Sequence, residues 1–305
     1  MKTQNPLLCD PKTGICELPQ TELTSIIKHI STEKKPVKVM YYTDPICSTC
    51  WGIEPQLRKL KLEYGGVLDI EYRMGGLLPD WSYNSGGISE PSDVAPHWDE
   101  VSKYYDMPID GDVWLEDPLH SSFPPSIAFK AAQLQSETKA LSFLRRIREM
   151  VFLEKKNITQ WLYLSAAAQE VSLELNQFKI DYESKAIELF KEDLQLGKQL
   201  GVMGFPSLFF VDAQQNQQLV YGFKPYAEYE KAIADAFPEV QKSSYNHSPE
   251  YLFGVFPTLT TKEFVELSEL SRPESDEKLQ ALARQQKITP LISKNGILWK
   301  VINTY

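Results

Sequence analysis

Residues 37–51 read VKVMYYTDPICSTCW, an apolar run followed by two cysteines that are separated by two residues. The run at 37–43 predicts a buried strand, and the segment from Cys47 onward predicts the start of a helix. Free N–H groups and the dipole at a helix N-terminus favour negative charge, so they stabilise a thiolate there. The short gap also lets the sulfurs of Cys47 and Cys50 come within bonding distance. The pattern predicts a disulfide-exchange site; the other common use of Cys-x-x-Cys is half of a zinc site.

The composition narrows the class of protein. Of 305 residues, 42% are hydrophobic and 24% are charged, and the net charge is −9. This charge argues against nonspecific nucleic-acid binding, and no apolar run reaches the ~18–20 residues that span a bilayer. Residues 1–20 lack the basic start and apolar stretch of a signal peptide, so a cytoplasmic location is expected. In that compartment a Cys-x-x-Cys is expected to be catalytic or redox-sensing rather than structural.

Hydrophobic periodicity predicts an α/β fold with a block of helices inserted between strands. A helix is expected after Cys50 and should end at Gly65-Gly66. The other expected helices span 21–31, 94–105, 127–135, 137–154, 159–169, 175–200 and 227–237, and the expected strands span 37–43, 67–73, 207–211 and 218–222. Because a parallel connection is right-handed by default, the first two strands should form a strand–helix–strand unit.

The C-terminal part predicts a separate small α+β module. Two short helices at 261–270 and 275–285 are followed by a hairpin around Asn295-Gly296, the favoured two-residue turn. This order is winged-helix-like. Residues 243–305 hold seven Lys or Arg and seven Asp or Glu, so they lack the electrostatic footprint of a DNA-binding module. Protein contact or dimerisation is the favoured role, and simple packing is the alternative.

A second motif, GVMGFP at 201–206, lies directly before the strand expected at 207–211. Proline is permitted at the start of a strand because it need not donate to the ladder there. We predict that the Phe205–Pro206 peptide is cis and lies beside the cysteines, where the preceding backbone is free to pair with an extended substrate. The alternative is a trans proline that only opens the strand.

Together these motifs resemble the DsbA-like branch of the thioredoxin superfamily. The resemblance covers about residues 36–240 and rests on the strand–Cys47-x-x-Cys50–helix unit, the helical insertion, Pro55 and the glycine–proline segment that ends at Pro206. Within the branch, DPICSTCWG is most similar to FrnE-like proteins and to cytoplasmic protease adaptors of the SpxH (YjbH) type. The resemblance implies a thioredoxin fold with a helical insertion at about 77–200.

The resemblance also implies roles for the site residues. Cys47 would be the exposed nucleophile with a lowered pKa, and Cys50 the buried resolving thiol. Pro206 would shape the substrate groove, with Phe205 against the sulfurs and the helical block as a cap. No bound cofactor is implied. The expected partners are protein or small-thiol disulfides and a thiol electron donor or acceptor, with no nucleic acid and no membrane.

The sequence departs from the family pattern at two places: the position of the buried acid and the two residues between the cysteines. Tyr41 stands where thioredoxins and DsbA carry a buried acid, six residues before the first cysteine. Asp44 is nearer in sequence, but its side chain is expected to face solvent, which leaves proton transfer from Cys50 unassigned. The inner pair Ser48-Thr49 lacks the histidine of DsbA, so a milder reduction potential is expected.

Four further residues carry open alternatives. Cys9 and Cys16 either form a second redox pair or regulatory disulfide, or remain two unpaired thiols; they could also complete a zinc site with Cys47 and Cys50, although their spacing is unusual for ligands. Trp51 and Trp81 either present apolar surface to a substrate or pack in the core, and packing is favoured for both.

The sequence therefore predicts three segments, at 1–35, 36–240 and 248–305, and a cytoplasmic thiol-disulfide oxidoreductase that acts through a mixed disulfide. The alternative is a redox-sensitive protease adaptor that uses the thioredoxin fold to hold a client. A third possibility, a glutathione-dependent isomerase or transferase, fits less well because such relatives normally lack a resolving cysteine such as Cys50.

Overall fold

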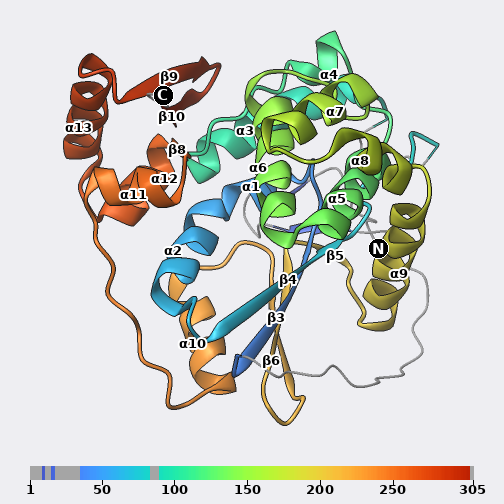
Figure 1. The fold of residues 1–305 in the computed structure, drawn as a ribbon, viewed down its shortest axis with the longest axis horizontal. Coiled ribbons are helices and arrows are strands. Elements are labelled where there is room, and N and C mark those ends of the chain that lie inside the picture. The colour runs from blue at the N-terminus through green and yellow to red at the C-terminus, as the bar shows by residue number, and fades with distance from the viewer. Residues whose placement is uncertain (1–8, 11–14, 18–34, 83–88, 303–305) are drawn as a thin grey trace.

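The computed structural model describes residues 9–10, 15–17, 35–82 and 89–302, with side chains from residue 35 onward. Its centre is a four-stranded sheet in the order β4-β3-β6-β7 (Figure 1). The strands are β3 (Val37–Thr43), β4 (Leu68–Met74), β6 (Ser207–Val211) and β7 (Gln217–Tyr221). The first two are parallel, whereas β6 is antiparallel to both β3 and β7. The strand predicted at 37–43 is confirmed, and β3 is buried on both faces as its unbroken apolar run requires.

The helix that follows the cysteines is divided into two. The short α1 (Ser48–Gly52) ends at Ile53, and α2 (Glu54–Tyr64) continues to the predicted Gly65. Pro55 lies in the first turn of α2, where its missing N–H costs no helical hydrogen bond. The division places Cys47 and Cys50 on a short helical segment directly after β3.

The predicted helical insertion is present and is built mainly from five longer helices. Its elements are η1 (Pro91–Asp93), α3 (Val94–Tyr105), α4 (Val113–Glu116), α5 (Phe123–Gln135), α6 (Glu137–Leu153), α7 (Trp161–Glu170), α8 (Leu175–Tyr182) and α9 (Lys185–Gln199). The single helix predicted at 175–200 is wrong. Ser184 interrupts it with a non-helical backbone (φ −138°, ψ −100°), and its hydroxyl donates to the Ile180 carbonyl at 2.5 Å. Serine side chains compete in this way with the backbone ladder of a helix.

The chain returns to the sheet through the predicted glycine–proline segment. Here β5 (Gly204–Phe205) precedes β6, and the Phe205–Pro206 peptide is cis, as predicted. The last helix of this part, α10 (Tyr226–Ala236), packs on β6 and β7. One large hydrophobic cluster runs from the sheet into the helical insertion.

A second sheet, in the order β8-β10-β9, forms the C-terminal module beside α2 (Figure 1). Its elements are α11 (Pro249–Val255), β8 (Thr258–Thr260), α12 (Thr261–Ser268), α13 (Arg272–Arg284), β9 (Ile288–Ser293) and β10 (Gly296–Val301). The two predicted helices and the hairpin are present, whereas α11 and β8 were not predicted. The module has a hydrophobic cluster of its own around Phe264 and Trp299. Its winged-helix character and the three segment boundaries remain predictions.

Near the N-terminus, β1 (Cys9–Asp10) and β2 (Ile15–Glu17) pair antiparallel, and β2 also pairs with β5. The helix predicted at 21–31 lies outside the described residues. Among the helices that the structure describes, none has the length and apolar character needed to cross a membrane.

Candidate functional site

The two cysteines occupy the first turn after β3. Cys47 is the N-cap of α1, and its sulfur accepts a hydrogen bond from the Cys50 backbone N–H at 3.2 Å. The Cys47 N–H in turn donates to the Asp44 carbonyl at 3.3 Å. This is the strand–dithiol–helix geometry that the sequence predicts, with a sulfur at the positive end of a helix.

Contrary to expectation, Cys47 is not exposed: both cysteine side chains are 0% accessible. The helical insertion covers α1 from one side. The Tyr105 ring of α3 lies so close to Gly52 that a Cβ there would be 2.6 Å from it, and the Tyr105 hydroxyl donates to Thr49 Oγ1 at 3.4 Å. The site is closed in this structure, so a disulfide in solution could reach the Cys47 sulfur only after the chain opens.

The electrostatics of the pair also differ from the expectation. Burial, followed by the hydrogen bond to Cys50, raises the pKa of the Cys47 thiol well above its usual value. Burial also opposes ionisation of Cys50, but the hydrogen bond from Cys47, the charge of Arg148 and the Thr43 hydroxyl together bring the pKa of Cys50 below its usual value. The lowered pKa predicted for Cys47 is therefore wrong in the closed state, because the stabilising groups converge on Cys50.

Arg148 supplies the positive charge behind the dithiol. It comes from α6 in the insertion, and its side chain is only 1% exposed. One Nη donates to Thr43 Oγ1 at 2.6 Å and to the Asp44 carbonyl at 3.2 Å, while the other donates to Glu54 at 2.6 Å. Arg148 was not predicted from the sequence, because it lies about a hundred residues beyond the motif and no local pattern marks it.

Asp44 is a second residue whose placement differs from the expectation. Its side chain is fully buried rather than at the solvent, and its two oxygens accept the backbone N–H groups of Ile46 at 3.0 Å and Leu77 at 2.8 Å. Burial raises the pKa of this carboxyl to about 6, although the hydrogen bonds act in the opposite direction. Tyr41, at the usual acid position, is also buried and accepts a hydrogen bond from Thr43 at 3.0 Å. Asp44 is thus the acid nearest in sequence to the cysteines within the buried site.

The Asp44→Asn variant should have a flatter dependence of stability on pH. The wild-type carboxyl titrates at about pH 6 when folded but near 3.9 when unfolded, so its favourable contribution is complete below about pH 4 and is lost as pH rises through 6. We expect the wild type to lose about 2–3 kcal/mol over this window on account of Asp44, and Asn to lose none of it. Urea unfolding at several pH values measures this difference, with the surface variant Asp181→Asn on α8 as control. Parallel pH curves for wild type and Asp44→Asn would refute the raised pKa.

Phe205 and Pro206 lie next to the end of β3. The last β3–β6 pair is Tyr42 with Ser207, so Pro206 comes one position beyond this register. The Phe205 ring is buried against Gly75, where a Cβ would be 1.8 Å from a ring carbon, so only glycine fits. The groove and binding role expected for Phe205 and Pro206 remain predictions.

The two tryptophans have packing partners. Trp51 is fully buried, stacks on Phe152 at 5.5 Å between ring centroids and donates to the Pro108 carbonyl at 3.0 Å. Trp81 donates to the Leu119 carbonyl at 2.8 Å. These contacts suit the packing role that the sequence analysis favoured over substrate binding.

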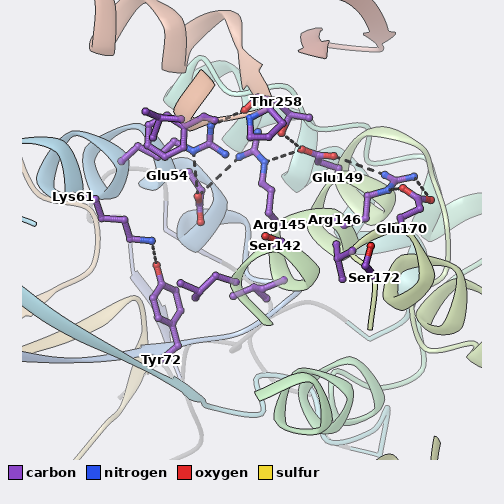
Figure 2. Close-up of a pocket in the computed structure, with 17 residues that line it drawn as sticks. Glu54, Lys61, Tyr72, Ser142, Arg145, Arg146, Glu149, Glu170, Ser172 and Thr258 are labelled. Carbon is purple, nitrogen blue, oxygen red and sulfur yellow. Dashed lines mark hydrogen bonds and ion pairs between the residues drawn. The ribbon is translucent and has the colours of Figure 1, made fainter. Parts of the chain in front are cut away.

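A cavity of about 580 Å³ lies where α2 and α6 meet the C-terminal module, and Figure 2 shows the charged side chains that line it. Arg145 from α6 forms a bidentate pair with Glu263 of α12 at 2.8 and 3.0 Å. Arg58 of α2 contacts the same carboxylate at 3.1 Å and donates to the Thr258 carbonyl at 2.6 Å. These three side chains form ion pairs with one another, and the pairs connect the C-terminal module to α2 and α6.

No group of three or more His, Cys, Asp or Glu side chains within the described part of the chain is arranged to hold a metal ion. The zinc site that would also use Cys9 and Cys16 depends on side chains outside that part.

Comparison with known proteins assigns the family. The profile of the thioredoxin family matches residues 40–231, which run from β3 into α10. The ClpXP adapter protein SpxH of Halalkalibacterium halodurans is 32% identical over 305 residues, and the match covers 98% of each chain. This chain belongs to the SpxH family of DsbA-like thioredoxin-superfamily proteins. The ClpXP adapter protein SpxH of Bacillus subtilis is 30% identical over 277 residues, or 89% of this chain and 91% of its own length.

Solved structures with the same fold include thiol-disulfide enzymes. A putative protein disulfide isomerase from Nitrosomonas europaea has a TM-score of 0.59 at 20% identity and matches 68% of this chain and 100% of its own. The cytosolic disulfide reductase DsbM from Pseudomonas aeruginosa has a TM-score of 0.53 at 23% identity and matches 65% of this chain and 100% of its own. At these identities the likeness shows the fold alone, and it confirms the predicted thioredoxin fold with a helical insertion.

Proposed function

We propose that this chain is an adapter that presents a client protein to a protease of the ClpXP type, and that the Cys47–Cys50 dithiol makes the adapter responsive to thiol oxidation. The observation that carries the proposal is the similarity to SpxH proteins over nearly the whole chain, C-terminal module included. The adapter, proposed in the sequence analysis as the alternative, thus has better support than the oxidoreductase. A cytoplasmic location is part of the same proposal.

Two structural features support the adapter. The disulfide reductase DsbM is matched over its full length by only 65% of this chain, so the chain has extra parts available for protein contacts. In addition, a fully buried Cys47 with a raised pKa is poorly suited to rapid exchange with bulky disulfides, since the thiolate is the nucleophile. A slow, gated dithiol suits sensing better than turnover.

A second function, thiol-disulfide exchange on protein or small-thiol disulfides, is favoured by a different observation. Hydrogen bonds and a nearby guanidinium stabilise the Cys50 thiolate, and a stabilised thiolate within the pair favours the reduced form, which makes the disulfide more oxidising. In this alternative, a separate thiol would donate or accept the electrons. The two functions make opposite predictions for a protein without the cysteines.

A Cys47→Ser, Cys50→Ser double variant separates the two functions. In the cell of origin, removal of this chain should lengthen the half-lives of a small set of proteins, and removal of the ClpX unfoldase should lengthen the same half-lives. We expect both the wild type and the double variant to restore rapid turnover in reducing conditions, because client binding does not need the thiols. Decay of the proteome after translation is stopped provides the measurement. Purified wild type should reduce insulin at close to the uncatalysed rate.

The opposite pattern would replace the adapter with the enzyme. In that case no protein half-lives would change with this chain, insulin reduction would be fast, and the double variant would abolish it. A Cys47→Ala, Cys50→Ala variant is the matched control, since it removes the same two thiols without placing a hydroxyl in the buried site.

A further inference from the structure

The N-terminal hairpin extends the sheet at the edge beside the dithiol. Strand β2 pairs antiparallel with β5, with Cys16 opposite Phe205 and Glu17 opposite Gly204. On its other side β2 pairs with β1, with Cys9 opposite Cys16, which gives a three-stranded sheet in the order β1-β2-β5. A segment that the sequence marked only by its cysteines is thus built into the backbone ladder of the site.

The edge that β2 covers lies at the end of β3 from which the chain continues to Cys47. The β3–β6 register ends with Tyr42 opposite Ser207. Phe205 lies two residues before Ser207 and therefore just outside that ladder. On the opposing strand, β3, Tyr42 is followed two residues later by Asp44, whose carbonyl accepts a hydrogen bond from the Cys47 N–H. A strand paired with Phe205 therefore lies at the end of the sheet where the dithiol loop begins. This is the edge where the sequence analysis expected the backbone to be free for an extended client; a strand of the same chain occupies it, in the manner of β-strand addition.

We propose that β2 is an internal occupant of the client groove, and that Cys16 is the intramolecular disulfide partner of Cys47, so that the Cys9–Cys16 and Cys47–Cys50 pairs exchange oxidation state within one chain. This inference rests on the proposal that the Cys47–Cys50 dithiol responds to oxidation. It adds the dithiol with which that pair exchanges electrons, Cys9–Cys16, and the strand that blocks the groove, β2. A client that binds by strand pairing at Phe205 must first displace β2.

The backbone of the hairpin suits a disulfide between Cys9 and Cys16. The two residues are direct partners in an antiparallel ladder, where Cα atoms are about 4.5–5.5 Å apart. Disulfides span Cα distances of about 4.4–6.8 Å. The register thus allows the second redox pair that the sequence analysis left open.

The exchange balances without any external reagent. The Cys47 thiolate attacks the Cys16 sulfur of a Cys9–Cys16 disulfide, and Cys9 leaves as a thiolate. The Cys50 thiolate then attacks the Cys47 sulfur, which closes the Cys47–Cys50 disulfide and releases Cys16 as a thiolate. Two electrons pass from the Cys47–Cys50 pair to the Cys9–Cys16 pair, and two protons follow them to the released thiolates.

The burial of Cys47 supports an internal partner. With 0% of Cys47 accessible, an external disulfide cannot reach the sulfur without opening the site, whereas β2 is already paired with β5 in the same chain. A tethered partner also acts at a high effective concentration, so the exchange should not depend on protein concentration.

The test is a trap made in the full chain. In a Cys9→Ser, Cys50→Ser variant only Cys16 and Cys47 remain, and oxidised glutathione should close them into an intramolecular disulfide. The matched control, Cys16→Ser with Cys50→Ser, keeps Cys9 and Cys47 and should close at least about tenfold more slowly, because Cys9 lies one strand farther away. Peptide mapping under non-reducing conditions identifies the linkage, and serial dilution shows whether it is intramolecular. Repeating both variants with Cys50→Ala guards against a folding defect caused by serine in the core.

Several results would overturn the inference. Equal closure in the two variants would show that the register does not select Cys16. Glutathione adducts or linked dimers without the internal disulfide would show that β2 is not beside Cys47. One zinc ion per chain that protects all four thiols of the wild type from alkylation would make the hairpin part of a metal site. None of these results bears on whether the chain delivers clients to the protease, so the two proposals fail separately.

Discussion

Replacing Glu263 with glutamine should lower the free energy of unfolding by about 3–5 kcal/mol, the usual loss when one partner of a buried ion pair is removed. The Glu263 side chain is 0% exposed and contacts two guanidinium groups, those of Arg145 and Arg58. Burial disfavours its charge, but these two cations hold the pKa of Glu263 below its usual value. Without the carboxylate, two desolvated cations remain close together, which is more costly than the loss of a single surface contact.

Denaturation in urea, followed by tryptophan fluorescence and circular dichroism, measures this loss. Glutamine is chosen because it keeps the length of the side chain and can still serve in the capping box that Glu263 forms with Thr260. The control is Glu266→Gln on the same helix, where the carboxylate is 40% exposed and pairs only with Lys262 among the described contacts. Surface pairs of this kind contribute about 0–1 kcal/mol. A Glu263→Gln variant as stable as this control would show that the ion pairs of Glu263 with Arg145 and Arg58 do not stabilise the docking of the module.

The sequence predicted the elements that follow from local patterns. The strand at 37–43 and the helix at 94–105 match β3 and α3, because an unbroken apolar run and a helical repeat each determine one type of structure. The Phe205–Pro206 peptide was placed correctly because the glycine–proline motif and the following strand are contiguous. The predicted helix at 175–200 failed at Ser184, where the backbone is not helical and the side chain bonds to the Ile180 carbonyl.

The environment of the dithiol could not be predicted in the same way. Its decisive groups come from distant segments: Arg148 arrives on α6, Tyr105 on α3, and Leu77 provides the N–H that holds Asp44 inward. The charge and burial of a thiol depend on such tertiary neighbours, whereas the motif itself fixes only the spacing of the sulfurs. For the same reason the pairing of β2 with β5 left no sign in the sequence beyond the presence of Cys16.

Replacing Arg148 with methionine should make the Cys47–Cys50 disulfide harder to reduce. Arg148 lowers the pKa of Cys50 and so stabilises the reduced pair, as the hydrogen bonds from Cys47 and Thr43 also do. Since a stabilised thiolate makes a dithiol more oxidising, its loss should shift the potential to more negative values, by about 30 mV for each tenfold change in equilibrium constant. Titration against glutathione measures the shift, and the ultraviolet absorbance of the thiolate reports the pKa of Cys50.

The dependence of this shift on pH distinguishes electrostatics from a general loosening of the fold. Below the pKa of Cys50 in the wild type, both proteins hold two neutral thiols, so their potentials should coincide. Above the higher pKa of Cys50 in the variant, the full difference should appear, because the wild-type thiolate alone has the guanidinium beside it. Arg146→Met is the matched control, since Arg146 lies on the same helix but pairs with Glu154 and Glu170, away from the cysteines. A shift that is constant with pH, or equal in both variants, would show that Arg148 acts on the packing of the site rather than on the thiolate.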